Sequence, residues 1–155
     1  MIVERANITD IDSLTELRLT YLKEDYGNLS EDDIKKIRQA LPDYFKKNLN
    51  NNIFCYVIKE NKEIIACAFL LIIEKPMSPA FITGRTGTVL NVYTAPSYRH
   101  QGCAKMIMNQ LLSDAVQKNL SVVELKATED GYHLYKSVGF TDDVSKYHFM
   151  KWYNQ

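Results

Sequence analysis

The order of local patterns along the chain predicts an α/β or α+β fold, in which helices cover both faces of a mixed sheet in a single domain of residues 1–155. Three observations support this prediction. The length of 155 residues, with 46% hydrophobic and 25% charged residues, is typical of one globular domain with a sizeable core. The hydrophobic periodicity changes repeatedly between that of strands and that of helices. One stretch, residues 88–115, combines a strand, a short loop with a glycine and a helix.

The first third of the chain predicts a short edge strand followed by two helices. Residues 1–6 form the strand candidate. Thr9 and Ser30 each precede a run of acidic and apolar residues, which is the pattern of a helix N-cap. Gly27 can end the first helix. Pro42 is expected to kink or restart the second helix, because proline has no N–H to donate.

The middle of the chain predicts a β-hairpin, followed by a segment whose pattern fits more than one local conformation. Residues 53–60 and 63–74 are rich in apolar and β-branched residues and flank a two-residue turn at Asn61 and Lys62. Residues 81–87 contain two glycines, which fit either a turn or a bulge. The remaining elements are predicted as a strand at 121–126, a helix at 129–137 with Gly139 at its C-terminal cap, and a final strand region from Phe140 to about Tyr153.

The stretch around the loop at residues 99–104 is the strongest functional signal in the chain. Residues 88–94 read as a strand that Pro96 ends, and a helical pattern begins after Gly102. A strand, glycine loop and helix in this order direct free backbone N–H groups, and the positive end of a helix dipole, beyond the strand. Such a turn is suited to bind a phosphate or pyrophosphate.

Composition argues against several other classes of function. The chain has 19 basic and 19 acidic residues, so no net charge favours nucleic acid or an anionic membrane as a partner. The three cysteines form no Cys-x-x-Cys pair, which argues against a zinc site and fits reduced thiols. No segment has the pattern of a membrane span or a signal peptide, so a cytoplasmic protein is expected.

Two motifs resemble those of the GCN5-related N-acetyltransferases (GNAT). The first is Arg99-x-x-Gly102-x-Ala104, and the second is the segment that reads Leu134-Tyr135-x-x-x-Gly139-Phe140. The resemblance implies a mostly antiparallel mixed sheet and an enzyme that transfers an acetyl group directly from acetyl-CoA to a primary amine. The zero net charge favours a small molecule or a peptide as the acceptor, and no metal is expected.

The same resemblance implies which residues bind the cosubstrate and which act on it. Backbone N–H groups of the loop would hold the pyrophosphate with added charge from Arg99, while His100 is expected to be an exposed loop residue. An N–H near Val92 would polarise the thioester carbonyl, and Tyr135 would act as the general acid that also contacts the cosubstrate. The full set of expected cofactor-binding residues is Val92, Tyr93, Thr94, Arg99, His100, Gln101, Gly102, Cys103, Ala104 and Tyr135.

The general base is the point at which the chain departs from the family pattern. Many members have a glutamate on the central strand where this chain has Leu90 and Asn91, and neither can accept a proton as a base. Asn91 is therefore expected to orient a water molecule or the amine. Deprotonation relayed by water, or binding of a neutral amine, is the working hypothesis. Four other carboxylates could face the site as bases, although each is expected to be a helix-end or surface charge: Glu24, Asp25, Glu129 and Asp130.

Two alternatives remain open from the sequence. The missing glutamate allows a non-catalytic module that binds acyl-CoA as a sensor or scaffold. Cys103 lies at the N-terminus of a predicted helix, which lowers the pKa of a thiol and could make it a nucleophile. Because transfer in the family is usually direct, Cys103 is expected instead to be a small residue of the loop. A homodimer that pairs through residues 147–153 is a further hypothesis.

Overall fold

The computed structural model describes residues 1–154 and contains one five-stranded sheet in the order β1-β2-β3-β4-β5. All neighbouring strands are antiparallel except β4 and β5, which are parallel. The predicted mixed, mostly antiparallel sheet is therefore confirmed. The strands are β1 (Val3–Arg5), β2 (Ile53–Glu60), β3 (Glu63–Glu74), β4 (Arg85–Thr94) and β5 (Val122–Glu124).

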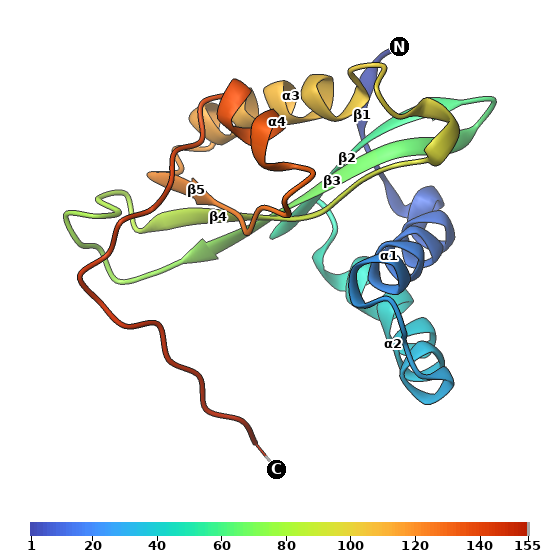
Figure 1. The fold of residues 1–155 in the computed structure, drawn as a ribbon, viewed down its shortest axis with the longest axis horizontal. Coiled ribbons are helices and arrows are strands. Elements are labelled where there is room, and N and C mark those ends of the chain that lie inside the picture. The colour runs from blue at the N-terminus through green and yellow to red at the C-terminus, as the bar shows by residue number, and fades with distance from the viewer. Residues whose placement is uncertain (155) are drawn as a thin grey trace.

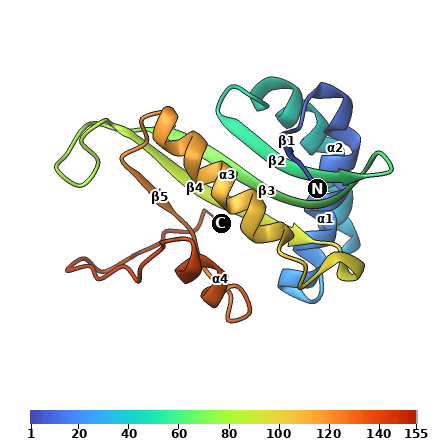
Figure 2. The ribbon, with the colours of Figure 1, turned by 90° about the horizontal axis from the view of Figure 1, so that it is seen from above.

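The helices form two layers on opposite faces of this sheet (Figures 1 and 2). Helices α1 (Ile11–Tyr26) and α2 (Glu31–Asn48) cover one face, and α3 (Cys103–Gln117) and α4 (Tyr132–Ser137) cover the other. Each layer has its own hydrophobic core. Phe45 of α2 packs against Phe69 of β3 on the α1/α2 face, whereas Leu111 of α3 belongs to the core on the other face.

The N-terminal helices differ from the predictions in two details. The N-cap is Asn7 and not Thr9. Asn7 forms a capping box with Asp10 at the start of a 3₁₀ turn (Ile8–Asp10), and this turn leads into α1. Thr9 is already inside that turn, so its hydroxyl donates to Asn7 Oδ1. The predicted Ser30 cap of α2 is confirmed, because its hydroxyl accepts the N–H of Asp33 at 3.1 Å.

Helix α2 runs through Pro42 as one helix, so of the kink or restart expected there, the restart does not occur. A proline inside a helix removes one backbone hydrogen bond. Here Leu41 and Phe45, on both sides of the proline, pack into the core against the sheet, and this tertiary contact holds the helix together.

The β2–β3 hairpin is confirmed, and both residues of its turn have positive φ: 51° at Asn61 and 68° at Lys62. These angles are those of a type I′ turn, which matches the twist of the strands. The ambiguous segment at 81–87 contains the start of β4 at Arg85, and a tight turn precedes it.

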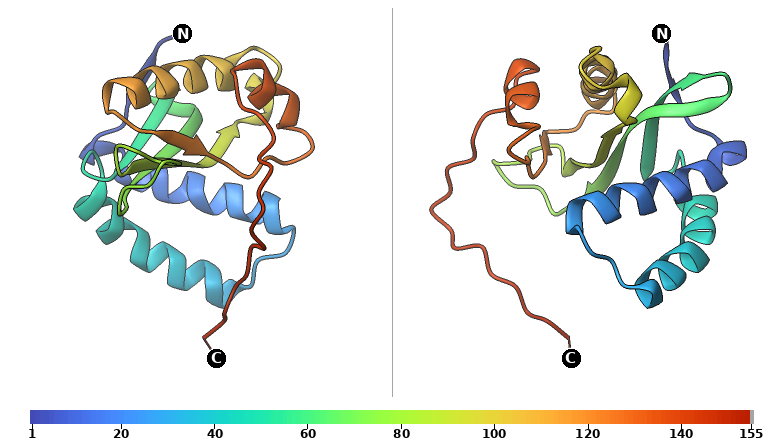
Figure 3. Two further views of the ribbon diagram at one scale, coloured as in Figure 1. Left: turned by 90° about the vertical axis from the view of Figure 1, so that its left-hand side faces the viewer. Right: turned by 45° about the vertical axis from the view of Figure 1, so that its right-hand side comes forward.

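The C-terminal third contains the main error of the sequence analysis. Strand β5 and helix α4 are shorter than predicted, and a Schellman motif at Gly139 ends α4 as expected: the Phe140 N–H donates to the Tyr135 carbonyl. The predicted final strand is wrong, because no strand lies within residues 140–154. This segment instead runs in an extended path away from the sheet (Figure 3). A strand needs a hydrogen-bonded partner, and none of residues 140–154 pairs with a strand in this structure.

Candidate functional site

The parallel pair β4 and β5 diverges after a short paired region. Only residues 86–88 of β4 pair with β5, so no strand within residues 1–154 pairs with that edge of β4 from residue 89 to residue 94. The two strands and the helices above and below them line an open cleft of about 2280 Å³. Pockets for small ligands usually measure about 300–1,000 Å³. The cleft therefore has room for a large ligand together with a second one.

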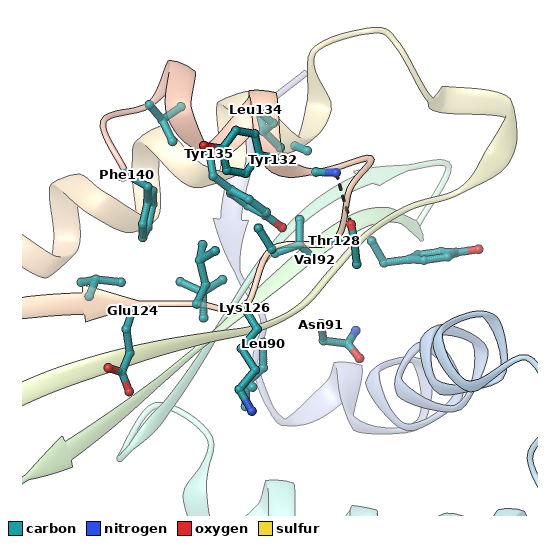
Figure 4. Close-up of a pocket in the computed structure, with 18 of the residues that line it drawn as sticks. Leu90, Asn91, Val92, Glu124, Lys126, Thr128, Tyr132, Leu134, Tyr135 and Phe140 are labelled. Carbon is teal, nitrogen blue, oxygen red and sulfur yellow. Dashed lines mark hydrogen bonds between the residues drawn. The ribbon is translucent and has the colours of Figure 1, made fainter. Parts of the chain in front are cut away.

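A β-bulge in β4 lies at the centre of this cleft. The register with β3 shifts between Cys67 and Phe69, and Asn91 adopts a left-handed conformation with φ of 57°. Bulges bend a strand and re-aim its side chains, and they are frequent beside active sites. The Asn91 side chain is only 2% exposed and points toward α1 (Figure 4). It meets Arg18 there, because Arg18 Nη1 donates to Asn91 Oδ1 at 3.3 Å.

Arg18 is a site residue that the sequence analysis missed. It lies three residues before Tyr21 on α1, and the guanidinium carbon is 5.9 Å from the centroid of the Tyr21 ring. The available signal was an arginine within the apolar face that Leu14, Leu17 and Tyr21 form on this helix. A charge in that position is unusual enough to indicate a function.

The three residues after the bulge divide between the two faces of the sheet. Val92 packs into the core on the side of α3 and α4, whereas Tyr93 packs on the side of α1. The Thr94 carbonyl accepts a hydrogen bond of 2.8 Å from Arg99 Nε. All three residues line the cleft.

The loop before α3 has the geometry expected of an anion-binding turn. His100 and Gly102 both have positive φ, 63° and 83°, and a Cβ atom on Gly102 would meet no atom within 4 Å. Cys103 and Ala104 are the first residues of α3, so their N–H groups have no partner inside the helix. The first bond of the helix runs from the Met106 N–H to the Gly102 carbonyl. The loop therefore presents free N–H groups to the cleft.

The side chains of the loop point in different directions, and not all of them face the cleft. The Gln101 side chain donates to the Ser97 carbonyl and does not line the cleft, while His100 is exposed. The Cys103 thiol is buried and lies 3.6 Å from the sulfur of Met1. Arg99 Nη2 pairs with Glu24 of α1 at 3.2 Å, and its guanidinium stacks over Tyr93. Arg99 thus faces α1 and not the start of α3.

Tyr135 enters the cleft from α4, on the face opposite Asn91 (Figure 4). Its side chain is 9% exposed, and its oxygen points toward the β4 backbone near Val92. Gly131 makes this position possible, since a Cβ atom there would lie 2.9 Å from the Tyr135 ring. Burial, with a smaller contribution from Tyr21, raises the pKa of Tyr135 to about 12. The phenol therefore stays protonated at neutral pH and can donate a hydrogen bond.

The carboxylates considered as bases are distributed around the rim. Glu24, Asp25 and Asp130 line the cleft, and Glu129 does not. Glu24 is already paired with Arg99. Within residues 1–154, no cluster of three or more His, Cys, Asp or Glu residues could hold a metal ion, and no helix is long and apolar enough to span a membrane.

The comparisons with known proteins agree with this geometry. The model of the acetyltransferase (GNAT) family matches residues 11–140. A predicted acetyltransferase from Clostridium acetobutylicum, solved with acetyl-CoA, is 30% identical with a TM-score of 0.83, covering 97% of this chain and 95% of its own.

Two more distant structures share the fold. A GCN5-related N-acetyltransferase from Ralstonia eutropha is 21% identical with a TM-score of 0.78, covering 96% of this chain and 97% of its own. A ribosomal-protein-alanine N-acetyltransferase from Brucella melitensis is 19% identical with a TM-score of 0.68, covering 97% and 100%. With a family model that matches most of its length, a diverging β4–β5 pair and a glycine loop at the start of α3, this chain belongs to the acetyltransferase (GNAT) family.

Proposed function

We propose that residues 1–155 act as one N-acetyltransferase domain that moves the acetyl group of acetyl-CoA directly to a primary amine of a small molecule or peptide. The observation that carries this proposal is the separation of β4 from β5, with the free N–H groups of α3 at one end and Tyr135 beside the gap. The amine nitrogen attacks the thioester carbon, the C–S bond breaks, and the amine gives up one proton while the thiolate gains one. The products are an amide and free CoA.

The start of α3 would hold the pyrophosphate through the backbone N–H groups of Gln101, Gly102, Cys103 and Ala104. In the structure the Arg99 guanidinium is engaged by Glu24. We therefore assign most of the binding to the backbone, with Arg99 as an additional charge near the loop. His100 would contribute its backbone to the turn, since its side chain is exposed.

The unpaired edge of β4 would hold the pantetheine arm, as a strand pairs with an extended ligand. Val92, Tyr93 and Thr94 carry the backbone groups in question, and these residues line the cleft. The N–H of Val92 would donate to the thioester oxygen as negative charge develops on it. A single donor of this kind typically accelerates a reaction by about 10²–10³-fold.

Tyr135 would donate a hydrogen bond to the leaving sulfur. A thiol ordinarily has a pKa near 8.5, so a phenol with a pKa of about 12 gives up its proton to a thiolate only at a cost. Stabilisation of the thiolate by a hydrogen bond from Tyr135, with the net proton coming from the amine, satisfies this constraint.

Asn91 cannot accept the proton that the amine loses, and we assign it the role of orienting the amine or a water molecule. Deprotonation then goes through water, or the amine binds in its neutral form.

The test is thiol release from acetyl-CoA with a panel of small amines and peptides, together with a calorimetric titration of acetyl-CoA. Gly102→Glu should abolish binding, because it places a carboxylate where phosphate would lie. Tyr135→Phe should bind acetyl-CoA normally and turn over about 10- to 100-fold more slowly, the usual cost of a charge-assisted hydrogen bond. Absence of acetyl-CoA binding to the unmodified protein would rule the proposal out.

A non-catalytic acyl-CoA sensor or scaffold is the second candidate, because Leu90 and Asn91 occupy the place of the expected carboxylate. A sensor would bind acetyl-CoA with the same loop and release no thiol with any amine. The phenol of Tyr135 would have no catalytic role in a sensor. Tyr135→Phe and the unmodified protein would then bind acetyl-CoA equally, and neither would release thiol.

We also propose a homodimer and a cytoplasmic location. Residues 140–154 form no strand within the chain and expose several large apolar side chains, while the outer edge of β5 pairs with no strand among residues 1–154. Each copy thus carries a free strand edge and a free extended segment, which are complementary. The three cysteines are free thiols, and such thiols persist in a reducing compartment.

A further inference from the structure

The guanidinium of Arg18 is a half-buried positive charge in the wall of the cleft. It donates to Asn91 Oδ1 at 3.3 Å and lies against the face of Tyr21. These two contacts fix the side chain, so little conformational entropy is lost when a ligand binds to it. Both contacts involve neutral groups.

No carboxylate pairs with Arg18 anywhere in residues 1–154. Three other arginines are paired: Arg38 with Glu16, Arg85 with Glu74 and Arg99 with Glu24. Arg5 also has no ion pair within residues 1–154, but it is exposed to solvent, whereas Arg18 is half-buried. Of the two acidic residues of α1 that line the same cleft, Glu24 is engaged by Arg99, and Asp25 forms no ion pair with any residue up to 154. A partly desolvated cation without a counter-ion is costly unless a ligand supplies one.

The position of Arg18 relates it to the second substrate and not to acetyl-CoA. Asn91 points to the α1 face of the sheet, whereas Tyr135 approaches the same gap from the α4 face (Figure 4). The start of α3, which presents the free N–H groups, also belongs to the α4 face (Figure 2). If the thioester reaches the gap from that side, as the proposed function requires, the attacking amine must approach from the α1 side. Arg18 is then beside it.

Resting on the proposed function, we propose that Arg18, held by Asn91, binds a carboxylate of the acceptor, so the substrate class is an amine that also carries a carboxylate, such as an amino acid. The planar guanidinium can donate two parallel hydrogen bonds to a carboxylate. Asn91 directly precedes Val92, and consecutive Cα atoms are about 3.8 Å apart. The anion site is therefore close to the reacting carbon, which fits a spacer of a few bonds between amine and carboxylate.

The same arrangement compensates in part for the missing base. A positive charge near an amine disfavours its protonated form and lowers its pKa. The acceptor would thus be bound by its carboxylate and presented with its amine nearer to the neutral state that attacks.

The experiment compares matched acceptors that differ only in charge. The probes are the L-amino acids, β-alanine and γ-aminobutyrate, each beside its carboxamide, assayed for thiol release with unmodified protein, Arg18→Gln and Arg18→Lys. The control is Arg38→Gln, which removes an exposed arginine of α2 that pairs with Glu16 outside the cleft. Acetyl-CoA affinity is measured for all four proteins.

We expect the unmodified protein to prefer the acid over the amide by at least about 10-fold in kcat/KM, the size of one charge-assisted contact. Arg18→Gln should raise KM for the acid about 10- to 100-fold, leave the amide unchanged and so remove the preference. Arg18→Lys should retain part of it, and Arg38→Gln all of it.

Three results would overturn the inference. Equal use of acid and amide by the unmodified protein is one. An equal loss with both acceptors in Arg18→Gln is the second, since it would mean that Arg18 only supports Asn91. Turnover only with amines that lack a carboxylate is the third, and it would leave the proposed function intact. Failure to bind acetyl-CoA would remove the proposed function and this inference together.

Discussion

At the residue scale, the contact between Arg18 and Asn91 gives a prediction that separates two roles for position 91. Asn91→Asp would place a carboxylate beside the guanidinium, where the oxygen of the amide now accepts at 3.3 Å. The new ion pair should satisfy Arg18 and exclude an acceptor carboxylate. We expect kcat/KM for amino acids to fall about 10-fold or more, with less effect on their amides. A rise with both acceptors, measured by thiol release, would show instead that a carboxylate at this position works as a base.

A second prediction at this scale concerns the buried thiol of Cys67. Burial raises its pKa to about 12, although a hydrogen bond from Asn91 acts in the opposite direction. In the unfolded chain the thiol ionises near pH 8.5. The stabilising effect of the neutral thiol is therefore fully present below that pH and is lost as the pH rises toward 12.

Urea unfolding at pH 7 and pH 10 checks this sign. At pH 7, Cys67→Ala should be less stable than the unmodified protein by about 1 kcal/mol for the lost sulfur contacts. At pH 10 the difference should shrink or reverse, because only the unmodified protein has this thiol to ionise. A difference that stays constant would contradict the assignment.

At the element scale, the start of α3 depends on a left-handed residue. Gly102 has φ of 83° in open space, and Gly27 at the end of α1 has φ of 69° in open space too. Alanine at either position should cost about 1–2 kcal/mol in stability through backbone strain alone. Only Gly102→Ala should also weaken acetyl-CoA binding, because strain there turns the N–H groups of the first turn. Calorimetry on both variants tests this, and equal affinity would place the phosphates elsewhere.

The elements also show which parts of the molecule the sequence could predict. Ser30 and the turn at Asn61 and Lys62 were predictable, because their effect is local and depends on a few neighbouring residues. The continuity of α2 through Pro42 was not predictable from the local sequence, because the packing of Leu41 and Phe45 into the core outweighs one missing N–H. The conformation of Asn91 and the approach of Arg18 were beyond reach, since they depend on contacts across 73 positions of sequence.

The loop at Gly102 and the position of Tyr135 lie between these cases. Two short motifs and the family resemblance identified them, and the structure puts both on the same cleft. The path of the last residues was not predictable in the same way. The apolar residues at 147–153 suggested a strand, but a local pattern does not specify a pairing partner, and the structure has no strand there.

At the scale of the whole molecule, the extended C-terminal segment gives the final prediction. Phe149 and Trp152 are 82% and 84% exposed, and the amine of Lys126, next to β5, lies 5.8 Å from the centroid of the Phe149 ring. Burial of one such side chain contributes about 1.5–3 kcal/mol, so several together can sustain a dimer in the micromolar range or tighter. Light scattering should give twice 17.9 kDa for the unmodified protein. Trp152→Asp and Phe149→Asp should each shift it toward 17.9 kDa.

Ile82→Asp is the matched control, since Ile82 is also an exposed apolar residue but lies in the turn before β4. It should leave the mass unchanged. A dimer joined by this segment would place Phe149 against β5 of the partner. Because Phe149 also lines the cleft, Phe149→Asp should then reduce turnover along with the mass. A monomer at high concentration would mean that the segment folds onto β5 of its own chain. In that case Phe149→Asp would change turnover and leave the mass at 17.9 kDa.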